Sequence, residues 1–567
     1  MICDEGCGRV PNRQRAGSKL DAFDQRCGEP SLLRGPLNEL AIHSKVLVMC
    51  IKILQPAVRT ILCIVAGTFA AAASAQSTQP PGVIGPQESP FKPTRAIAIV
   101  GGTLIDATGA PPKLNYTVII EGERITRVGR SEDVKIPQSA EIIDAEDMVI
   151  MPGIVNSNQH LQLNSLYPAP TADLPIDVLR ARWEETFARM PFRAYVYLMQ
   201  GITTMRQTSG PSERILPVIR KIDAGQLPGP RVFLGGALFM SDEHFDSYTR
   251  ENQTPAAAID WLRNEFAYNV IDDLDEDTDK YLGPEYNYWK LYMSDEIYDG
   301  TNDFTDEELR YIIDKAHKHG KRVDVHAGPH NRGLRRMLAF DVDSLEHPFY
   351  GHEVIEADII RGYVEKGVII DTLLRVMITG AEHAANPHRF NETLYIMSME
   401  PKEYRILMHY RDKMLLNKKH PDRAGLPIYQ SMVDRSAGGS GDTFGLSGPS
   451  YNDMQARRAT SHENMRRFIR EGAKFSLGTD TPSFLNFQQE DPNAREYAYM
   501  IREGMAPMEA IIAATRNGAE VLGLEDELGT IEAGKLADVI VVTGNPLSDI
   551  DALKNIYAVV KGGVRYK

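Results

Sequence analysis

Amphipathic stretches alternate with short apolar runs through the middle of the chain. One amphipathic stretch begins at Thr305 and Glu308, which have the spacing of a capping box, and continues with apolar residues at helical intervals. The apolar run RVDVHA follows it and contains His326. A second stretch has the same order, with Ser461 as its expected N-cap, and leads into KFSLGTD. This alternation predicts parallel strands, each connected to the next by a helix.

Eight strand ends can be placed by this pattern within residues 151–528. They fall near Asn156, Arg206, Gly235, Lys290, His326, His347, Asp371 and Asp480. Eight strand–helix units in roughly 380 residues are typical of a (β/α)8 barrel with insertions. Residues 387–453 have few strand signals, so we interpret them as an insertion between the last two strands.

The regions on either side of the predicted barrel have a different pattern. Residues 95–150 contain short apolar runs separated by Gly, Pro and Asn turns, and residues 529–567 repeat this texture. Both regions therefore favour β-strands. The predicted fold class is α/β: a TIM-like (β/α)8 barrel with a small β-sandwich domain formed by both ends of the mature chain.

The beginning of the chain has the pattern of an exported protein. Residues 49–75 place two basic residues before an apolar run that closes on the small-x-small sequence ASA, which is typical of a cleaved signal peptide. We interpret residues 1–48 as a non-native N-terminal extension and residues 76–94 as a flexible leader. The protein is expected in the periplasm or secreted, with no stable membrane insertion after cleavage, because the apolar run is shorter than a membrane-spanning helix.

The composition excludes some kinds of catalytic site and binding partner. All five cysteines of the 567-residue chain precede residue 76, so the mature chain should contain neither a cysteine nucleophile nor a cysteine-ligated metal. The net charge of −14 lacks the basic surplus that binding to nucleic acid usually requires. We therefore expect a small-molecule substrate and no nucleic-acid partner, while a homo-oligomer remains an open alternative.

Several predicted strand ends have side chains that can bind a metal ion. Lys290, His326, His347 and Asp480 lie at four of them, and His160 lies just beyond a fifth. A single histidine or aspartate is more often structural, but barrel enzymes place their chemistry where the parallel strands end. The repeated placement therefore indicates one shared site.

A series of motifs runs in order from about Ile99 to Lys567: GGTLIDATG, MPGIVNSNQH, GITTMRQ, GPRVFLGG, YWKLY, VDVHA, DSLEHP, ENMRRFIREGAKFSLGTDTP, AIIAATRNGAEVLG and GTIEAGKLADVIVV. Their order and spacing resemble the amidohydrolase superfamily of metal-dependent hydrolases, close to its imidazolonepropionase-like and prolidase-like branch.

The resemblance implies a metal centre at the mouth of the barrel, with one or two divalent ions per chain. Zn²⁺ suits the nitrogen and oxygen ligands, and Mn²⁺, Co²⁺ and Fe²⁺ are alternatives. Lys290 would be carboxylated, because an ammonium group has no lone pair to offer a metal. His326 and His347 would complete one metal position, and His160 with Asp480 would form the other. Asp480 would also accept a proton from the attacking water.

This chain departs from the usual His-x-His pattern of the family, because it reads Asn158-Gln159-His160. Asparagine offers a neutral carbonyl oxygen, which is a poorer ligand than imidazole. Three interpretations stay open: a two-metal enzyme that uses Asn158 as a ligand, a one-metal enzyme, and a site that has lost its metal.

The resemblance implies hydrolysis of a carbon–nitrogen bond in an amide, a cyclic amide or a dipeptide-like substrate by metal-activated water. One alternative is a heterocycle deaminase with the same fold. Another is a catalytically lapsed barrel that acts as a binding protein. The sequence identifies no substrate-binding residue, and fold alone does not determine the substrate.

Overall fold

A computed structural model of the chain describes the following residues, with a few isolated positions between them: 91–162, 176–238, 240–241, 270–271, 273–293, 304–327, 330–349, 353–375, 451–481 and 492–567. These residues belong to one compact unit that spans Ile84–Lys567. The predicted N-terminal extension and signal peptide lie outside the described residues, as do most of the predicted leader and insertion. Those assignments stay predictions.

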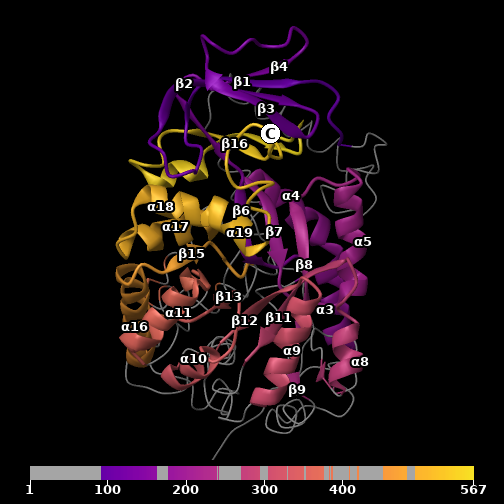
Figure 1. Ribbon diagram of the computed structural model, residues 1–567, viewed down its shortest axis with the longest axis vertical. Helices are drawn as coiled ribbons and strands as arrows, with labels where there is room; N and C mark the ends of the chain where they lie inside the picture. Colours follow the sequence, from indigo (N-terminus) through magenta and orange to yellow (C-terminus); the bar gives the residue numbers. More distant parts are fainter. Residues whose placement is uncertain are drawn as a thin grey trace, which may run out of the picture. The chain divides into compact units, whose positions relative to one another are not determined.

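The central element is a sheet of eight parallel strands (Figure 1). Neighbours in the sheet follow the order of the chain, and each strand runs parallel to the next. Its strands are β6 (Ile154–Gln159), β7 (Ile202–Gln207), β8 (Arg231–Leu238), β11 (Tyr286–Tyr292), β12 (Arg322–His326), β13 (Ser344–Glu346), β14 (Ile369–Asp371) and β15 (Lys474–Ser476). The eight predicted strand ends lie in these strands or within four residues of them.

Backbone hydrogen bonds join the first strand of the sheet to the segment after the last. The amide of Ser157 donates to the carbonyl of Leu477 at 2.8 Å, and the amide of His160 donates to the carbonyl of Thr481 at 2.8 Å. These bonds close the sheet into a barrel, which confirms the predicted fold class. Gly478 lies at the junction, where a Cβ atom would stand 3.1 Å from the Cβ of Asn158. The two segments can approach this closely because residue 478 has no side chain.

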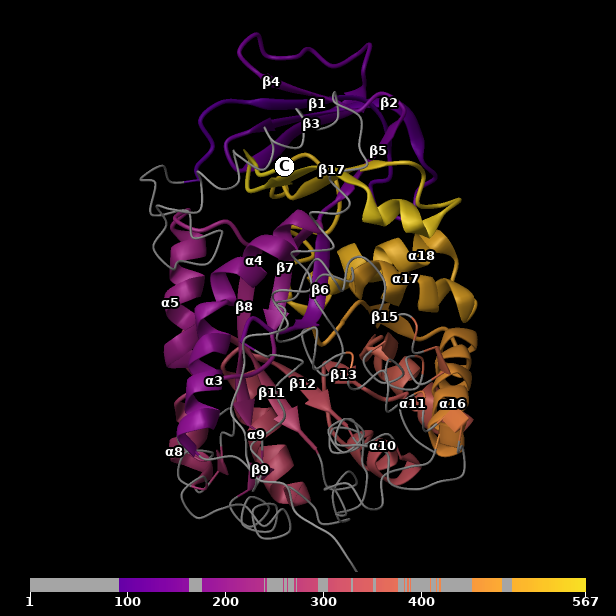
Figure 2. The ribbon, with the colours of Figure 1, turned by 180° about the vertical axis from the view of Figure 1, so that it is seen from behind.

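Helices connect the strands and pack on the outside of the barrel (Figures 1 and 2). α4, α5 and α9 each pack against the strand that follows them. The helices of the described residues are α3 (Ile176–Ala188), α4 (Met190–Met199), α5 (Ser212–Asp223), α8 (Leu274–Asp279), α9 (Asp306–Lys318), α10 (Asn331–Met337), α11 (Ala357–Lys366), α16 (Tyr451–Arg470), α17 (Pro492–Arg502), α18 (Pro507–Ile512) and α19 (Gly518–Val521), with the π-helix η3 (Ala513–Asn517) and the 3-10 helix η4 (Ile550–Lys554).

Helix α9 has the start that its sequence predicts. Thr305 is the N-cap, and both hydrogen bonds of the capping box with Glu308 are present. The predicted apolar stripe is buried against the barrel, and it consists of Leu309, Ile312, Ile313 and Ala316. Local sequence alone therefore determines where this helix begins and which face it buries.

The prediction that Ser461 caps a helix is wrong. Helix α16 begins ten residues earlier, at Tyr451, and Ser461 lies inside it. The Ser461 hydroxyl donates to the carbonyl of Arg457 at 2.9 Å, which is the bond that a serine makes to the preceding turn inside a helix. Residues 454–459, MQARRA, are mostly strong helix formers, so the helix continues through the expected cap.

Strands from both ends of the chain share a second sheet, in the order β18-β17-β16-β5-β1-β2-β3, with β4 paired to β1. These strands are β1 (Ile97–Leu104), β2 (Lys113–Glu121), β3 (Arg124–Arg130), β4 (Glu141–Asp144), β5 (Met148–Pro152), β16 (Val539–Thr543), β17 (Ile556–Lys561) and β18 (Val564–Arg565). Strands β5 and β16 pair antiparallel and join the two parts. A two-stranded sheet of β9 (Met240–Ser241) and β10 (Val270–Ile271) completes the strands.

Strand β16 contributes to two hydrophobic cores at once. Val539 and Val541 pack in the core of the second sheet, whereas Ile540 and Val542 pack in the core of the barrel. Successive side chains of a strand point to opposite faces, so one strand with apolar residues at every position can serve both cores. Among the described residues, no helix is long and apolar enough to cross a membrane.

Glu503 follows α17 and ties it to α16. Its carboxylate lies 3.0 Å from His462 Nδ1 and 2.5 Å from Arg466 Nη1, and its side chain is 2% exposed. Burial alone would raise the pKa of Glu503, but hydrogen bonds to His462 and Arg502 outweigh it and lower the pKa to about 2. The ionised carboxylate therefore stabilises the packing of these two helices.

Replacing Glu503 with Gln should lower the free energy of unfolding at pH 7 by about 1–3 kcal/mol, because a neutral amide replaces the buried carboxylate that accepts hydrogen bonds from Arg466 and Arg502. The folded pKa of about 2 lies below the ordinary 4.5, so this stabilisation is present above pH 4.5 and is lost as the pH falls from 4.5 through 2. Urea unfolding of both proteins at pH 7 and pH 3 should show a smaller difference at pH 3.

Glu463→Gln is the matched control. Glu463 also pairs with arginines, at 3.0 Å from Arg466 and 2.9 Å from Arg470, but its side chain is 36% exposed. Exposed pairs contribute about 0–1 kcal/mol, so this variant should change little at either pH. An equal loss at pH 7 and pH 3 for Glu503→Gln would contradict the assignment of a low pKa.

Candidate metal centre and active site

The structure places all of the predicted ligands at the end of the barrel where the strands stop. Lys290 lies in β11, and His326 is the last residue of β12. His347 directly follows β13, His160 directly follows β6, and Asp480 lies beyond β15. All but Asp480 are at least nine-tenths buried, and the Asp480 side chain is 13% exposed. The site is therefore a largely desolvated cluster of titratable groups.

His326 and His347 lie side by side, and Glu346 lies with them. The two imidazole centroids are 4.3 Å apart, and the ring centroid of Tyr292 also lies 4.3 Å from that of His326. His326, Glu346 and His347 each offer one ligand atom within 4.8 Å of the others. Two imidazoles and a carboxylate at this spacing can hold a divalent metal ion.

An unusual backbone conformation brings Glu346 and His347 to the same place. Successive side chains of a regular strand point to opposite faces, yet these two neighbours both belong to the group. His347 has a φ of 58°, in the left-handed region, so the chain leaves strand geometry at this residue. Asp480, with a φ of 51°, does the same across the site. Strained residues of this kind gather at functional sites.

Both histidines of the group are neutral at pH 7. Burial, together with His347 and Lys290, lowers the pKa of His326 well below its ordinary value. Burial lowers the pKa of His347 to about 4, with Lys290 adding to the effect and Asp480 opposing it. Neutral imidazole is the form that binds metal. The Nδ1 atom of His347 is buried and has no hydrogen-bond partner among the described residues, which suits a metal ligand and is unfavourable otherwise.

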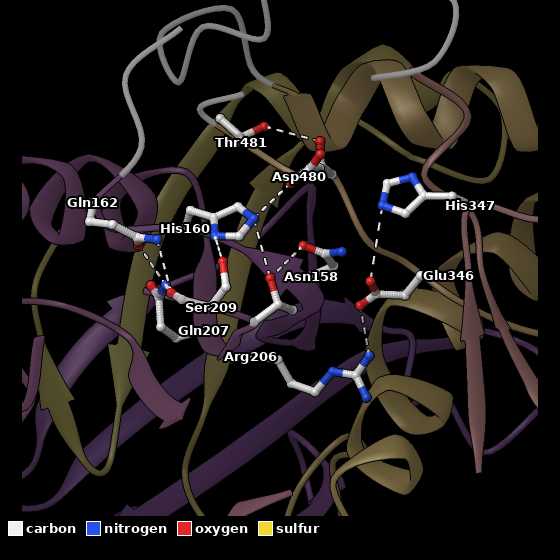
Figure 3. A network of polar contacts seen from close by, with 12 residues as sticks. Asn158, His160, Gln162, Arg206, Gln207, Ser209, Glu346, His347, Asp480 and Thr481 are labelled. Carbon is white, nitrogen blue, oxygen red and sulfur yellow. Dashed lines mark hydrogen bonds and ion pairs between the residues drawn. The ribbon is translucent and has the colours of Figure 1, made fainter. Parts of the chain in front are cut away.

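The second half of the site surrounds His160 (Figure 3). His160 Nε2 lies 2.7 Å from Asp480 Oδ1. The Thr208 hydroxyl donates to Asn158 Oδ1 at 3.2 Å and lies 3.2 Å from His160 Nε2, while Ser209 Oγ lies 3.5 Å from His160 Nδ1. Asn158, which stands where the family usually has a histidine, therefore faces the site. Thr208 holds the amide oxygen of Asn158 beside His160.

Lys290 is where the sequence predicts it, but its surroundings are acidic. Its Nζ contacts a carboxylate oxygen of Glu346 and lies 3.2 Å from Asp324 Oδ2. Burial lowers the pKa of Lys290, and Asp324 opposes that shift. The predicted carboxylation of Lys290 stays a prediction, and its product would face two carboxylates.

Arg206 links these carboxylates beneath the site. Its Nη2 lies 2.9 Å from Asp324 and 3.3 Å from both Glu346 and Asp371, and its side chain is 1% exposed. Burial alone would lower the pKa of Arg206, but the nearby carboxylates of Asp324 and Asp371 outweigh it and raise the pKa. The sequence places Arg206 near the end of one of the eight predicted strands and gives no sign of its partners. In the structure, Arg206 lies at the centre of a buried ionic network.

Sequence reasoning missed Glu346, Asp324 and Thr208. Glu346 directly precedes His347, so its place at a strand end was a signal, but strand alternation argues that neighbours point apart. Asp324 stands two residues before His326 and therefore on the same face of β12, which was a second usable signal. Thr208 follows β7 with no distinguishing pattern.

Comparison with known proteins identifies the family. The model of the amidohydrolase family matches residues 149–565, so the chain belongs to the amidohydrolase family. The chain is similar to an imidazolonepropionase of Brevibacillus brevis, with 22% identity over 475 residues that cover 78% of this chain and 88% of that protein. It also matches a 5'-deoxyadenosine deaminase of Methanothrix thermoacetophila, with 48% identity over 52 residues that cover 9% of this chain and 12% of that protein.

A solved structure agrees with the fold. A Xaa-Pro dipeptidase with bound methionine superposes with a TM-score of 0.60 and 22% sequence identity, and the match covers 83% of this chain and all of that one. Family and fold together make this chain a hydrolase that acts on carbon–nitrogen bonds, as the sequence predicted. Members of this family are generally metal-dependent, in accord with the group of His326, Glu346 and His347.

Replacing His347 with Ala should lower the content of bound metal and lower turnover by about 100-fold or more, because the loss of a ligand exceeds the 10–100-fold effect of losing an outer partner. Elemental mass spectrometry of the dialysed protein measures the metal. His317→Ala is the control, since His317 is a partly exposed histidine paired with Asp343 at 2.9 Å. Equal metal contents in the two variants would exclude His347 from the metal site.

Proposed function

We propose that the chain uses a divalent metal ion, with Zn²⁺ as the best-suited ion, to hydrolyse the carbon–nitrogen bond of an amide, a cyclic amide or a dipeptide-like substrate. The supporting observation is the buried group of His326, Glu346 and His347, with two neutral imidazoles and the unpaired Nδ1 of His347. The names of two similar proteins, an imidazolonepropionase and a Xaa-Pro dipeptidase, favour this substrate range.

The donor set favours zinc. It consists of imidazole nitrogens and carboxylate oxygens, and the sequence has no cysteine after residue 63. These are ligands that Zn²⁺ accepts, and Mn²⁺, Co²⁺ and Fe²⁺ share them. A divalent ion held there supplies Lewis acidity, which lowers the pKa of water and polarises a carbonyl oxygen.

Asp480 and His160 are suited to proton transfer in this reaction. Asp480 is hydrogen-bonded to His160 at 2.7 Å, and its side chain faces the site with 13% exposure. Asp480 accepts the proton of the attacking water and returns it to the departing amine, which cannot leave as an anion. His160 holds the Asp480 carboxylate in place for both transfers.

A heterocycle deaminase is the second candidate, because a segment of 52 residues is 48% identical to a 5'-deoxyadenosine deaminase. Both reactions add water to a carbon bonded to nitrogen. They differ in the product, since a deaminase releases ammonia from an exocyclic amine and an amidohydrolase releases an amine and a carboxylate.

The purified protein should turn over at least one class in a panel of N-acyl amino acids, dipeptides and lactams. Activity should disappear with a chelator and return with zinc, because the ion is needed to activate water. A parallel panel of amino-substituted heterocycles, assayed for ammonia, tests the deaminase. Slow turnover that is insensitive to chelators would contradict the metal-dependent hydrolase, and bound metal without turnover on either panel would favour a binding protein.

Asn158→His should raise the number of zinc ions bound per chain, because imidazole is a better zinc ligand than the neutral amide that now lies beside His160. Elemental analysis after dialysis measures the change. Asn158→Gln keeps an amide and serves as the control. An unchanged zinc content in a folded Asn158→His protein would show that residue 158 is not what limits metal binding in this half of the site.

A further inference from the structure

The hydroxyl of Tyr197 lies between the two segments that close the barrel. Tyr197 belongs to α4, and its hydroxyl donates to the carbonyl of His160 at 2.9 Å and to the carbonyl of Thr481 at 3.1 Å. His160 directly follows β6, whereas Thr481 follows Asp480 beyond β15. One buried side chain therefore contacts both ends of the sheet, next to the hydrogen-bonded pair of His160 and Asp480.

The sheet itself holds this junction only in part. His160 and Asp480 lie beyond the last residues of β6 and β15, so regular strand pairing does not fix them. The amide of His160 donates to the carbonyl of Thr481 at 2.8 Å. The amide of Asp480 donates to the carbonyl of Asn158 at 2.9 Å. Asp480 has a φ of 51°, a conformation that persists only when the surrounding contacts maintain it. A donor from outside the sheet therefore adds to what holds the junction.

Helix α4 presents a second donor to the segment after β6. Arg193 lies one turn before Tyr197 on the same face of α4, and its guanidinium donates to the carbonyl of Leu161 at 2.6 Å and to that of Thr186 at 3.1 Å. Arg193 is 3% exposed and Tyr197 is fully buried. Because α4 packs against β7, both donors are supported by the barrel wall. Side chains on a packed helix hold their partners more precisely than side chains on a loop.

The Tyr197 hydroxyl keeps its proton at neutral pH. Burial raises the pKa of Tyr197, and the negative charge of Asp480 adds to this effect, while Arg193 opposes it. Tyr197 is therefore a permanent hydrogen-bond donor to the two carbonyls, whatever the protonation state of the pair beside it.

We propose that Tyr197 is a positioning residue for proton transfer, because its hydroxyl fixes the backbone of His160 relative to that of Thr481. This inference rests on the proposed function, in which Asp480 accepts the proton of the attacking water. Figure 3 shows the side chains of His160 and Asp480 pointing toward each other, and His160 Nε2 lies 2.7 Å from Asp480 Oδ1. A shift of either segment moves this carboxylate, and a displacement of about 1 Å can lower a rate by about 100-fold.

The first test is the kinetics of Tyr197→Phe, which keeps the ring in the core and removes only the hydroxyl. On the fastest substrate of the panel described above, kcat should fall by about 10–100-fold. KM and the content of bound metal should stay unchanged, because the hydroxyl donates to backbone carbonyls and not to the group of His326, Glu346 and His347. An unchanged kcat, or a change confined to KM, would overturn the proposal.

Tyr363→Phe is the matched control. Tyr363 is 1% exposed, and its hydroxyl donates to the carbonyl of Leu334 at 2.7 Å, between α11 and α10. Each variant loses one buried hydroxyl donor, so both should lower the melting temperature by about 1 °C. Only Tyr197→Phe should lower kcat. An equal loss of kcat in the two variants would reduce the role of Tyr197 to general stability.

Hydrogen exchange of the full chain, followed by mass spectrometry, gives a readout that needs no substrate. The amide of His160 bonds to Thr481, so in Tyr197→Phe it should exchange about 2–10-fold faster, while Tyr363→Phe should leave its exchange unchanged. Unchanged exchange at His160 in Tyr197→Phe would contradict the proposed contact.

The outcomes separate this proposal from the proposed function. If the unmodified chain turns over nothing on either panel, the proposed function fails, and the role of Tyr197 in proton transfer fails with it. If the unmodified chain is active and Tyr197→Phe keeps its kcat, only the role of Tyr197 fails. Faster exchange at His160 together with a lower kcat and an unchanged KM is the result that supports it.

Discussion

The buried guanidinium of Arg206 is the interaction on which the active end of the barrel depends. It extends from β7 across the interior and meets carboxylates from β12, β13 and β14. A charge that is 1% exposed is tolerated only when it is fully paired, and the three carboxylates would in turn repel one another without it. The network therefore fixes β7 relative to three neighbouring strands on the other side of the barrel interior, β12, β13 and β14. Strands β12 and β13 end in His326 and Glu346, so the same network sets the spacing of the candidate ligands.

The site is assembled from the first and last strands of the barrel as well as from its middle. His160 follows β6 and Asp480 follows β15, and these strands become neighbours only through the hydrogen bonds that close the sheet. One half of the site, around His326 and His347, has a metal-binding character. The other half contains the hydrogen-bonded pair of His160 and Asp480, with the Asn158 amide where the family pattern has a second imidazole. Asymmetry between the halves is the main departure of this chain from the usual family pattern.

Periodicity in the sequence predicted the elements well because it is a local property. The capping box at Thr305, the buried stripe of α9 and the positions of the eight barrel strands are all present. The partners of the side chains were not predictable in the same way. Arg206 and Asp371 are far apart in the chain, and nothing in a single sequence indicates that they meet. Glu346 was missed because the left-handed conformation of His347 breaks the strand alternation from which side-chain directions are inferred. Ser461 failed as a cap because strong helix formers precede it.

Strand β16 has a consequence for how the chain reaches its native state. Its partner β5 lies far before it in the sequence, with all eight barrel strands between the two. Both hydrophobic cores contain residues of this strand, so neither can be completed before β16 has paired with β5. Contacts between such distant segments form slowly, because a long loop must first be closed. Until β16 has paired, the edge of β5 that it will cover and apolar surface of the barrel stay accessible, which exposes the folding chain to aggregation.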